Sequence, residues 1–273
     1  MIQFSIVTPS YNYGQFIGDC MGSVAAQNGV TFEHLVFDAQ STDNTLEVLA
    51  QFPHAQVVSE PDRGMCDGIN KGFDRCKGEW VMWLNSDDRL QPGALETVAS
   101  FAKRNPEVDV IFGCWNFIDD GGKFIRTMTL FPHNRRMMLY LGCYIGSTAT
   151  FFRRSTVIEK GERLSLDFRY VMDGEFYARL AAKNFKFCYL PKVLADFRLH
   201  GSNLSMKNYK ARNAEECLQL QKQFGETRAY RRAYGHSTFK DENLNALLDS
   251  LLYLFYRSLK PILKLLNRHR LKK

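Results

Sequence analysis

Short apolar runs alternate with helical patterns along the first 112 residues, and this alternation limits the possible folds more than any other feature of the sequence. Five apolar runs are typical of strands: 4–8, 34–38, 57–59, 80–84 and 108–112. Patterns with helical spacing separate them, at 16–24, 46–52, 68–76 and 92–105. Strands that alternate with helices favour a doubly wound, mostly parallel sheet with helices on both faces. Such a sheet binds ligands beyond the carboxyl ends of its strands.

After residue 113 the rhythm changes. Residues 115–130 predict a hairpin that turns at Asp120, Gly121 and Gly122. The further expected elements are a helix at 135–141, a strand at 148–153, a helix at 174–184 and two strands at 185–191 and 193–200. From about residue 209 the pattern is helical to the end. We therefore expect one α/β domain over 1–208, in two halves (1–112 and 113–208), and a helical C-terminal extension over 209–273.

Acidic residues follow several of the predicted strands. Asp38 closes the second strand, and in "WVMWLNSDDRL" (80–90) an apolar strand runs directly into Asn85, Ser86, Asp87 and Asp88. A parallel sheet would gather these side chains at one edge, together with acids of the loop "EPDRGMCDGIN". Crowded carboxylates repel one another unless a cation, a donor-rich ligand or protonation compensates. A cluster of oxygen ligands suits Mg²⁺ or Mn²⁺ on a diphosphate, and the alternative is that each acid caps the next helix.

Four segments, "SIVTPSYN", "DAQSTDNT", "SEPDRGMCDGINKG" and "WLNSDD", occur in the order and approximate spacing found in inverting glycosyltransferases of family 2, which have the GT-A fold. The resemblance covers roughly residues 1–205 and is greatest for the branch that assembles bacterial surface polysaccharides such as O-antigen or capsule. It implies that 1–112 binds a nucleotide and that 113–208 holds the acceptor and the catalytic base. The implied reaction moves a hexosyl unit from a UDP-sugar to a saccharide hydroxyl.

The resemblance also implies roles for single residues. The substrate-binding residues would be Thr8, Pro9, Tyr11, Asn12, Asp38, Arg63, Asp67, Asn85, Ser86 and Asp87. The Tyr11 ring would stack on the base, and Asp38 would accept a hydrogen bond from the uracil N–H. Asn85 stands where the family often has Asp and would face the ribose. Asp87, Asp88 and His200, the last within "FRLHGSNLS", would hold Mn²⁺ or Mg²⁺ on the diphosphate.

"YVMDGEFYARL" (170–180) resembles the segment in which the family places its catalytic base, and Asp173 is the matching acid. Inversion needs one base to take the proton of the attacking acceptor hydroxyl, and a carboxylate can do so. Asp173 could also be the N-cap of the helix that follows, and Glu175 remains a rival base. A non-catalytic sugar-nucleotide-binding module is the alternative function, and Asp173 is the feature that separates the two.

The formal net charge of +7 indicates an anionic partner. Much of this charge lies in "LLDSLLYLFYRSLKPILKLLNRHRLKK" (247–273), which combines a broad apolar face with Lys and Arg. A basic amphipathic helix suits an anionic membrane surface, as a lipid-linked acceptor would require, while a core-covering or dimerising helix is the alternative. Charge concentrated in the tail disfavours a nucleic-acid binder. The absence of GxGxxG after the first strand disfavours a dinucleotide oxidoreductase.

Seven cysteines without a CxxC pair favour reduced thiols in the cytoplasm. The N-terminal "MIQFSIVTPSYN" has neither a basic region nor a long apolar region, so we expect no signal peptide. No run of 18 apolar residues occurs, so we expect no spanning helix. The expected location is therefore cytoplasmic, either free or peripheral on the inner face of the cell membrane.

Overall fold

The structure is a computed structural model that describes residues 2–133, 143–201, 203, 216, 258, 259, 261 and 262. Its elements in chain order are β1 (Phe4–Ser10), α1 (Gly14–Ala25), β2 (Phe32–Asp38), α2 (Thr45–Leu49), β3 (Ala55–Ser59), α3 (Met65–Arg75), β4 (Trp80–Trp83), β5 (Arg89–Leu90), α4 (Ala94–Arg104), β6 (Val110–Ile118), β7 (Phe124–Met128), η1 (Ser147–Ala149), β8 (Thr150–Arg153), η2 (Arg154–Ile158), α6 (Met172–Ala182) and β9 (Phe187–Arg198). The helix expected at 135–141 and nearly all of the extension 209–273 lie outside the described residues.

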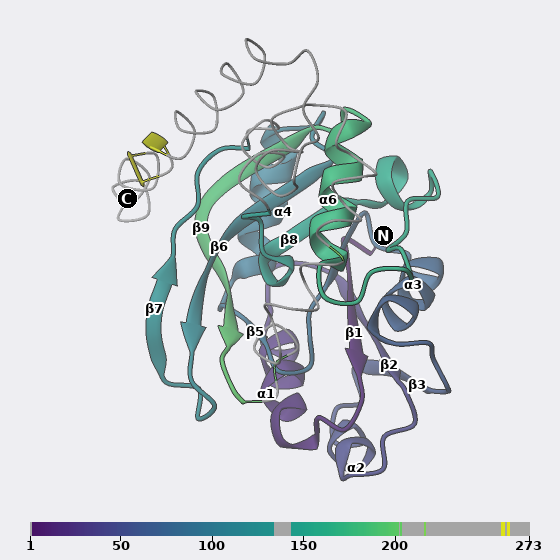
Figure 1. The fold of residues 1–273 in the computed structure, drawn as a ribbon. Helices are drawn as coiled ribbons and strands as arrows, with labels where there is room; N and C mark the ends of the chain where they lie inside the picture. The colour runs from purple at the N-terminus through teal and green to yellow at the C-terminus, as the bar shows by residue number, and fades with distance from the viewer. Residues whose placement is uncertain are drawn as a thin grey trace, which may run out of the picture.

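One sheet organises the described part of the chain, in the strand order β3-β2-β1-β4-β8-β6-β9-β5, with β7 beside β6 (Figure 1). The strands β3, β2, β1 and β4 are parallel to one another. Every residue of β1 and β4 is buried, because helices cover both faces of this part of the sheet. This explains the continuous apolar runs and confirms the doubly wound sheet expected from the sequence.

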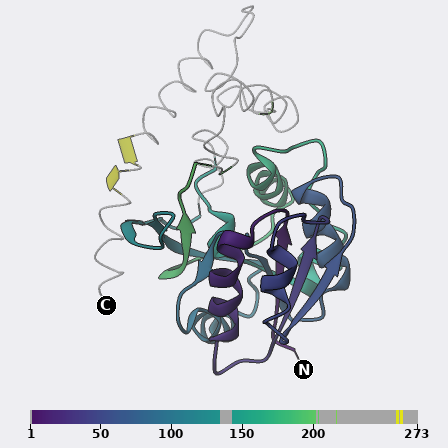
Figure 2. The same ribbon diagram turned by 90° about the horizontal axis from the view of Figure 1, so that it is seen from below.

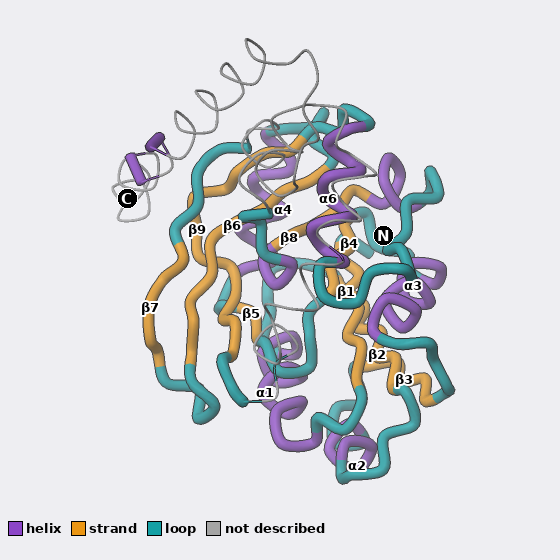
Figure 3. The backbone as a smooth tube through the Cα atoms, in the orientation of Figure 1, coloured by secondary structure: helices purple, strands orange, loops and turns teal. Residues whose placement is uncertain are grey.

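Beyond β4 the sheet is mixed. β8 pairs antiparallel with both β4 and β6, and β5 and β7 are antiparallel to their partners. β6 and β9 pair in parallel, and Figure 3 shows them running side by side with β7. The expected parallel order thus applies to the first four strands. The predicted hairpin is confirmed as β6 and β7, with Gly122 in the left-handed region (φ 83°) at its turn.

Several predicted boundaries differ from the structure, and two of the differences have a clear physical reason. The two strands expected at 185–191 and 193–200 form the single strand β9. Phe112 pairs with Tyr189 and Cys114 with Val193, so β9 has extra residues opposite Gly113, and Pro191, which has no N–H, lies in this bulge. Helix α4 begins at Ala94 rather than at Pro92. Gly93 before it is left-handed (φ 68°), and this conformation delays the first helical turn.

Helices pack on both faces of the sheet (Figure 2). On one face, Phe73 of α3 and Phe176 of α6 contact each other and Trp83 of β4, with ring centroids 6.0 to 6.4 Å apart. On the other face, Ile17 and Met21 of α1 and Leu49 of α2 form a cluster around Val36. Within the described residues, no helix is both long enough and apolar enough to cross a membrane.

Candidate functional site

The carboxyl ends of β1, β2 and β3 meet at one edge of the sheet. Ser10 pairs in register with Asp38, and Asp38 pairs with Ser59. The loop after β4 joins them, because the Ser86 hydroxyl donates to the Pro9 carbonyl oxygen at 2.8 Å. The structure therefore brings Pro9, Asp38 and Ser86 to the same edge, as expected for a parallel sheet.

Asp38 lies at this edge with only 1% of its surface exposed. Its carboxylate accepts hydrogen bonds from the Ser41 N–H at 3.0 Å, from the Ser41 hydroxyl and from the Ser59 hydroxyl at 2.8 Å. Hydrogen bonds to a charged acceptor are stronger than neutral ones, so these donors fix the orientation of the carboxylate.

Asn12 connects the loop after β1 to the loop after β2. Its backbone N–H donates to the Ser41 hydroxyl at 2.8 Å, and its Oδ1 accepts from the Thr42 N–H at 2.8 Å. Its φ of 55° lies in the left-handed region, which Asn tolerates better than most residues. Asn12 thus holds the neighbouring Tyr11, whose side chain is 57% exposed, next to the Asp38 loop.

Thr8 is fully buried, and its hydroxyl lies 2.9 Å from Nε2 of His34. Its expected role beside a nucleotide base stays a prediction. Successive side chains of a strand point to opposite faces, and Thr8 points into the protein interior. His34 is equally buried, and burial together with the neighbouring His54 lowers its pKa to about 3.

Arg63 and Asp67 form a pair at the start of α3. The Arg63 guanidinium donates to Asp67 Oδ1 at 2.8 Å, and the Arg63 backbone N–H donates to Oδ2 at 3.1 Å. These hydrogen bonds from Arg63 lower the pKa of Asp67. The pair fixes the loop before α3. The Arg63 side chain remains 73% exposed to solvent.

Asp87 meets the predicted histidine directly. Its Oδ2 lies 2.9 Å from Nε2 of His200 and accepts from Nδ2 of Asn203 at 3.2 Å. The His200 ring packs against Phe16 of α1, with centroids 4.6 Å apart, and this contact fixes its plane. Two residues that are 113 positions apart in the chain are thus joined at the end of β4.

Asp88 follows Asp87 in the loop after β4 and is only 1% exposed. Its Oδ1 accepts from the Arg198 backbone N–H at 3.0 Å, and its Oδ2 accepts from the Thr148 hydroxyl at 2.8 Å and from Nδ2 of Asn85 at 3.2 Å. Burial, and then the charge of Asp87, raise the pKa of Asp88 well above its ordinary value. These bonds make Asp88 an anchor for the loop, and its role as a metal ligand stays a prediction.

Asn85 has one buried side-chain atom without a hydrogen-bond partner among the described residues. Its Oδ1 is buried and accepts no hydrogen bond from the described residues, although its Nδ2 donates to Asp88. A buried acceptor without a donor costs free energy, typically about 1 to 3 kcal/mol. A hydroxyl of a bound molecule would satisfy it.

Sequence reasoning missed Arg198. Its side chain is 2% exposed and donates to the backbone oxygens of Asp87 and Asp120, each at 2.8 Å, and to Oδ2 of Asp19 at 2.6 Å. Arg198 therefore joins the Asp87 loop, the β6–β7 turn and α1. A buried Arg needs several acceptors, and the sequence offers only a weak signal for it, an Arg two residues before His200 in an apolar strand.

Asp173 lies in the first turn of α6. Its Oδ1 accepts from the Gly174 N–H at 2.7 Å, and burial raises its pKa above the ordinary value. Glu175 is fully buried and its two oxygens accept from the Arg179 guanidinium at 2.7 and 2.9 Å. Both oxygens of Glu175 are therefore engaged by Arg179 of its own helix, which favours Asp173 over Glu175 as the group open to a substrate.

Helices α3 and α6 begin side by side. The Cys66 thiol lies 3.2 Å from Sδ of Met172 and donates to the Phe168 carbonyl oxygen at 3.2 Å. Cys66 precedes Asp67, and Met172 precedes Asp173. This contact places the start of α6, which carries Asp173, next to the start of α3, which carries Asp67.

These side chains can be compared with the ligands that a divalent metal ion prefers. Asp87 and His200 supply a carboxylate oxygen and an imidazole nitrogen, both accepted by Mn²⁺, at the end of a strand. Among the described residues, no group of three or more His, Cys, Asp or Glu is arranged to hold a metal. The donor set thus fits an ion that takes its remaining ligands from a bound diphosphate or from water.

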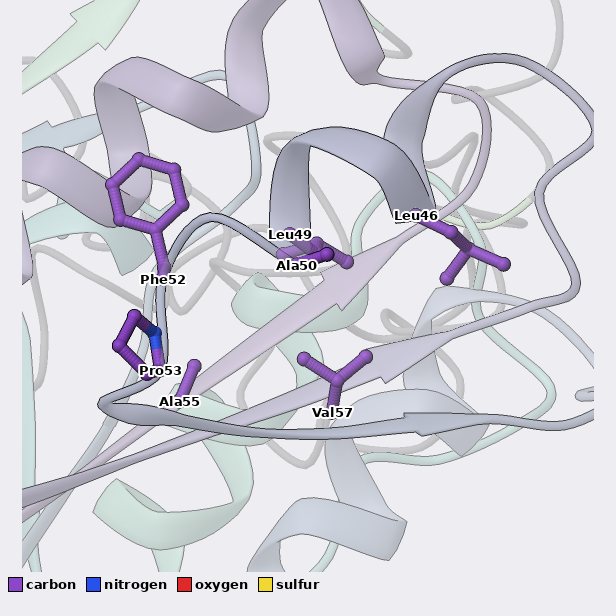
Figure 4. A pocket seen from close by; sticks show the side chains of 7 residues that line it. All are labelled: Leu46, Leu49, Ala50, Phe52, Pro53, Ala55 and Val57. Carbon is purple, nitrogen blue, oxygen red and sulfur yellow. The ribbon is translucent and has the colours of Figure 1, made fainter.

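An apolar pocket lies elsewhere, between α2 and the edge strand β3 (Figure 4). Its lining consists of Leu46, Leu49, Ala50, Phe52, Pro53, Ala55 and Val57. None of the predicted site residues contributes to it, so it is separate from the edge described above.

Curated relatives match most of the chain at low identity. A chondroitin synthase of Pasteurella multocida (strain Pm70) is 24% identical over 93% of this chain. A hyaluronan synthase of Pasteurella multocida is 26% identical over 74% of it. The chain spans only 26% and 21% of the lengths of these two relatives. A PGL/p-HBAD biosynthesis glycosyltransferase of Mycobacterium bovis (strain BCG / Pasteur 1173P2) is 29% identical over 64% of this chain and 68% of its own length.

Solved structures share the fold. S. aureus TarS 1–349 in complex with UDP-GlcNAc superposes with a TM-score of 0.67 at 17% identity, over 93% of this chain and 81% of that chain. The mannosyltransferase PcManGT from Pyrobaculum calidifontis, in complex with GDP-Man and Mn²⁺, gives 0.59 at 16% identity, over 92% and 69% of the two chains. At these identities the likeness establishes the fold, which is of the GT-A type.

The sequence also matches a family model. The model described as glycosyl transferase family 2 covers residues 5–161, which is more than half of the 273 residues. This range contains β1 to β8 and therefore both the Asp38 edge and the Asp87 loop. The chain belongs to glycosyl transferase family 2.

Proposed function

We propose that this protein is an inverting glycosyltransferase that moves a hexosyl unit from a UDP-sugar to a saccharide hydroxyl during the synthesis of a bacterial surface polysaccharide. The observation that carries the proposal is the grouping of Asp38 and Asp87 at the carboxyl ends of parallel strands, with Asp173 at the start of α6 beside α3. Membership in the family and the names of the relatives support it.

UDP-sugar is the proposed donor. The exposed Tyr11 ring would stack on the uracil, Asp38 would accept its N–H, and the buried Oδ1 of Asn85 would accept from a ribose hydroxyl. Pro9, Asn12, Ser86 and the Arg63–Asp67 pair would shape the rest of the nucleotide site. The TarS structure, which was solved with UDP-GlcNAc, supports a UDP-sugar donor.

Mn²⁺ or Mg²⁺ is the proposed cofactor, and Asp87 and His200 would hold it. When bound, the ion would neutralise the charge that develops on the departing diphosphate. Arg198, Asp88 and Asn203 would keep these two ligands in place through the hydrogen bonds already described. PcManGT, solved with Mn²⁺, supports a divalent ion in this fold.

Asp173 is the proposed base. The acceptor hydroxyl oxygen forms a bond to the anomeric carbon from the face opposite UDP, and the bond from that carbon to the diphosphate oxygen breaks. Asp173 takes the hydroxyl proton, and an α-linked donor gives a β-linked product. Burial raises the pKa of Asp173, and a raised pKa makes a carboxylate a more effective proton acceptor near neutral pH.

The acceptor is proposed to be lipid-linked, which would place the protein on the inner face of the cell membrane. The basic residues of 247–273 support this, although they lie almost entirely outside the described residues. Removal of residues 245–273 should abolish sedimentation with anionic liposomes. Unchanged sedimentation would refute the membrane proposal and leave the transferase proposal intact.

The central experiment is a hydrolysis panel. UDP-glucose, UDP-galactose, their N-acetyl forms and GDP-mannose are incubated with the protein and Mn²⁺ without acceptor, and the released nucleotide is measured. Turnover of one UDP-sugar that is lost in Asp87→Ala supports the proposal. Tight binding of UDP without turnover of any donor, even with saccharide acceptors added, would favour a non-catalytic sugar-nucleotide-binding module instead.

A further inference from the structure

Glu216 lies beyond the residues that match the family model, yet its side chain contacts the loop before α6. Its Oε1 accepts from the Arg169 N–H at 2.9 Å. Its Oε2 accepts from the Tyr170 N–H at 2.7 Å and from the Val171 N–H at 3.0 Å. Three consecutive backbone donors thus converge on one carboxylate that comes from at least 45 positions further along the chain.

The backbone N–H groups of this loop need a hydrogen-bond acceptor from another part of the chain. Val171 is the N-cap of α6, and its side chain has no group that could cap the helix. Backbone N–H groups ahead of a helix have no carbonyl within the helix to bind, and unpaired ones are costly when they are removed from water. A carboxylate satisfies them with charge-assisted hydrogen bonds and is also favoured at the positive end of the helix dipole.

The same loop carries the proposed base. Asp173 follows Val171 by two residues and accepts a hydrogen bond from the Gly174 N–H at the start of its own helix. The loop packs on α3 through Cys66, whose thiol donates to the Phe168 carbonyl oxygen. Burial, and then the charges of Glu216 and Asp173, raise the pKa of the Cys66 thiol to about 12, so both carboxylates act on the same thiol.

We propose that Glu216 is a positioning residue for Asp173, so that a side chain from at least 45 positions further along the chain sets the position of the loop before the base. This inference rests on the proposed function in one respect, the role of Asp173 as base. The contact itself does not depend on that role, and the two can be tested separately.

The contact is tested by amide hydrogen exchange on the full-length protein. Amides 169–171 should be protected in the wild type, and Glu216→Ala should speed their exchange about tenfold, the effect of losing a charge-assisted hydrogen bond. Peptides from α3 should keep their exchange rates, and Glu47→Gln, an exposed acid on α2, should change nothing at 169–171. Unprotected amides in the wild type, or equal exchange in Glu216→Ala, would refute the contact.

The positioning role is tested by steady-state kinetics with the UDP-sugar that the wild type turns over. Glu216→Gln should lower kcat about 100-fold, because an amide NH₂ facing backbone N–H groups displaces the loop, and small displacements of a catalytic group are costly. The KM for the UDP-sugar and the affinity for UDP should stay unchanged, whereas partial unfolding would alter both. Faster exchange at 169–171 with an unchanged kcat would overturn the positioning role.

Failure of the proposed function gives a different result. In that case the wild type turns over no sugar nucleotide, while hydrogen exchange still decides whether Glu216 holds the loop. If Glu216→Ala does not fold, Glu216→Gln, which keeps the size of the side chain, supplies both measurements.

Discussion

The surroundings of Asp87 and those of Asp173 differ in how they are built. Asp87 and Asp88 lie at the end of a central strand and receive hydrogen bonds from Thr148, Arg198 and Asn203, all of which come from distant parts of the chain. Asp173 accepts from the next residue of its own helix, and the loop before it depends on Glu216. The Asp87 loop is therefore held by residues from several distant parts of the chain, whereas the loop before Asp173 is held by Glu216 and by its contact with Cys66.

This difference teaches which properties should change together. Substitutions around Asp87 should reduce stability and nucleotide binding together, because the same hydrogen bonds serve both. Substitutions around Asp173 should reduce turnover and leave stability and nucleotide binding largely unchanged.

The largest effect is expected for Asp173→Asn. The carboxamide keeps the shape of the side chain but cannot take a proton, so kcat should fall by about 10² to 10⁴, the usual contribution of a general base. Isothermal titration should give the same UDP affinity as the wild type. Asp167→Asn, an exposed acid in the loop before α6, serves as the matched control. Equal turnover in Asp173→Asn would remove it as the base.

The pH dependence gives a second check on Asp173. The acid is active only when deprotonated, so activity should be lost as the pH falls through its pKa. Because burial raises that pKa, the loss should occur at a higher pH than for an ordinary Asp. A log kcat/KM profile that stays flat down to the ordinary pKa of Asp would contradict this.

Arg198→Gln should have the next largest effect, on stability. The change leaves the Asp87 and Asp120 carbonyl oxygens and the Asp19 carboxylate without their donor, at a cost of about 3 kcal/mol in the free energy of unfolding. Urea denaturation measures this, and UDP affinity should fall as well. Arg126→Gln, at an exposed position on β7, should change the stability by about 0.5 kcal/mol or less. Equal stability of the two variants would show that the Asp87 loop does not depend on Arg198.

The next prediction concerns the pH dependence of stability, which should depend on the buried His34 next to Thr8 of β1. Its pKa is lowered to about 3 in the folded state, below the ordinary 6.5, so the unfolded chain binds its proton more readily. Its contribution is fully present above pH 6.5 and is lost as the pH falls from 6.5 towards 3, by about 1.4 kcal/mol per pH unit.

The measurement for His34 is the free energy of unfolding in urea at several values between pH 7.5 and pH 5. Protonation of carboxylates can also lower the free energy of unfolding as the pH falls. The relevant quantity is therefore the difference between the wild type and His34→Gln in the slope of the free energy of unfolding against pH. The variant should have the smaller slope. Equal slopes would mean that the pKa of His34 is the same in the folded and the unfolded protein.

The smallest effect is expected for Tyr11→Ala. Loss of stacking on a base should weaken UDP binding by about 1 kcal/mol, at the low end for such contacts because the ring is exposed. Stability should not change, and Tyr11→Phe should bind UDP as the wild type does. Equal affinity in Tyr11→Ala would exclude the ring from the nucleotide site.

The sequence predicted the parallel half of the sheet well, from β1 to α4. Its strands are short, and β1, β2 and β4 are almost entirely buried. The helices between them repeat their apolar residues with helical spacing, so each element could be recognised by itself. The prediction was less accurate for β9, where Pro191 suggested a break. A bulge opposite Gly113 accommodates the proline, and such a bulge depends on the partner strand rather than on local pattern.

The residues of the candidate site also differ in how clearly the sequence indicated them. Asp38 and Asp87 could be found because they directly follow apolar strands and match family motifs, and Ser86 was found with them. The role of Thr8 beside the base stays a prediction, and its hydroxyl lies next to His34. Arg198 and Glu216 have no local pattern that indicates their roles, because the groups they bind are distant in sequence.

The local elements, the acids at the strand ends and the family could be recognised from the amino-acid sequence, because periodicity and short motifs are properties of neighbouring residues. The position of β8 between β4 and β6, the support of the Asp87 loop by Arg198 and the contact of Glu216 with the loop before Asp173 became visible in the folded chain. Buried donors and acceptors must be paired. Which distant residue supplies the partner depends on the path of the folded chain.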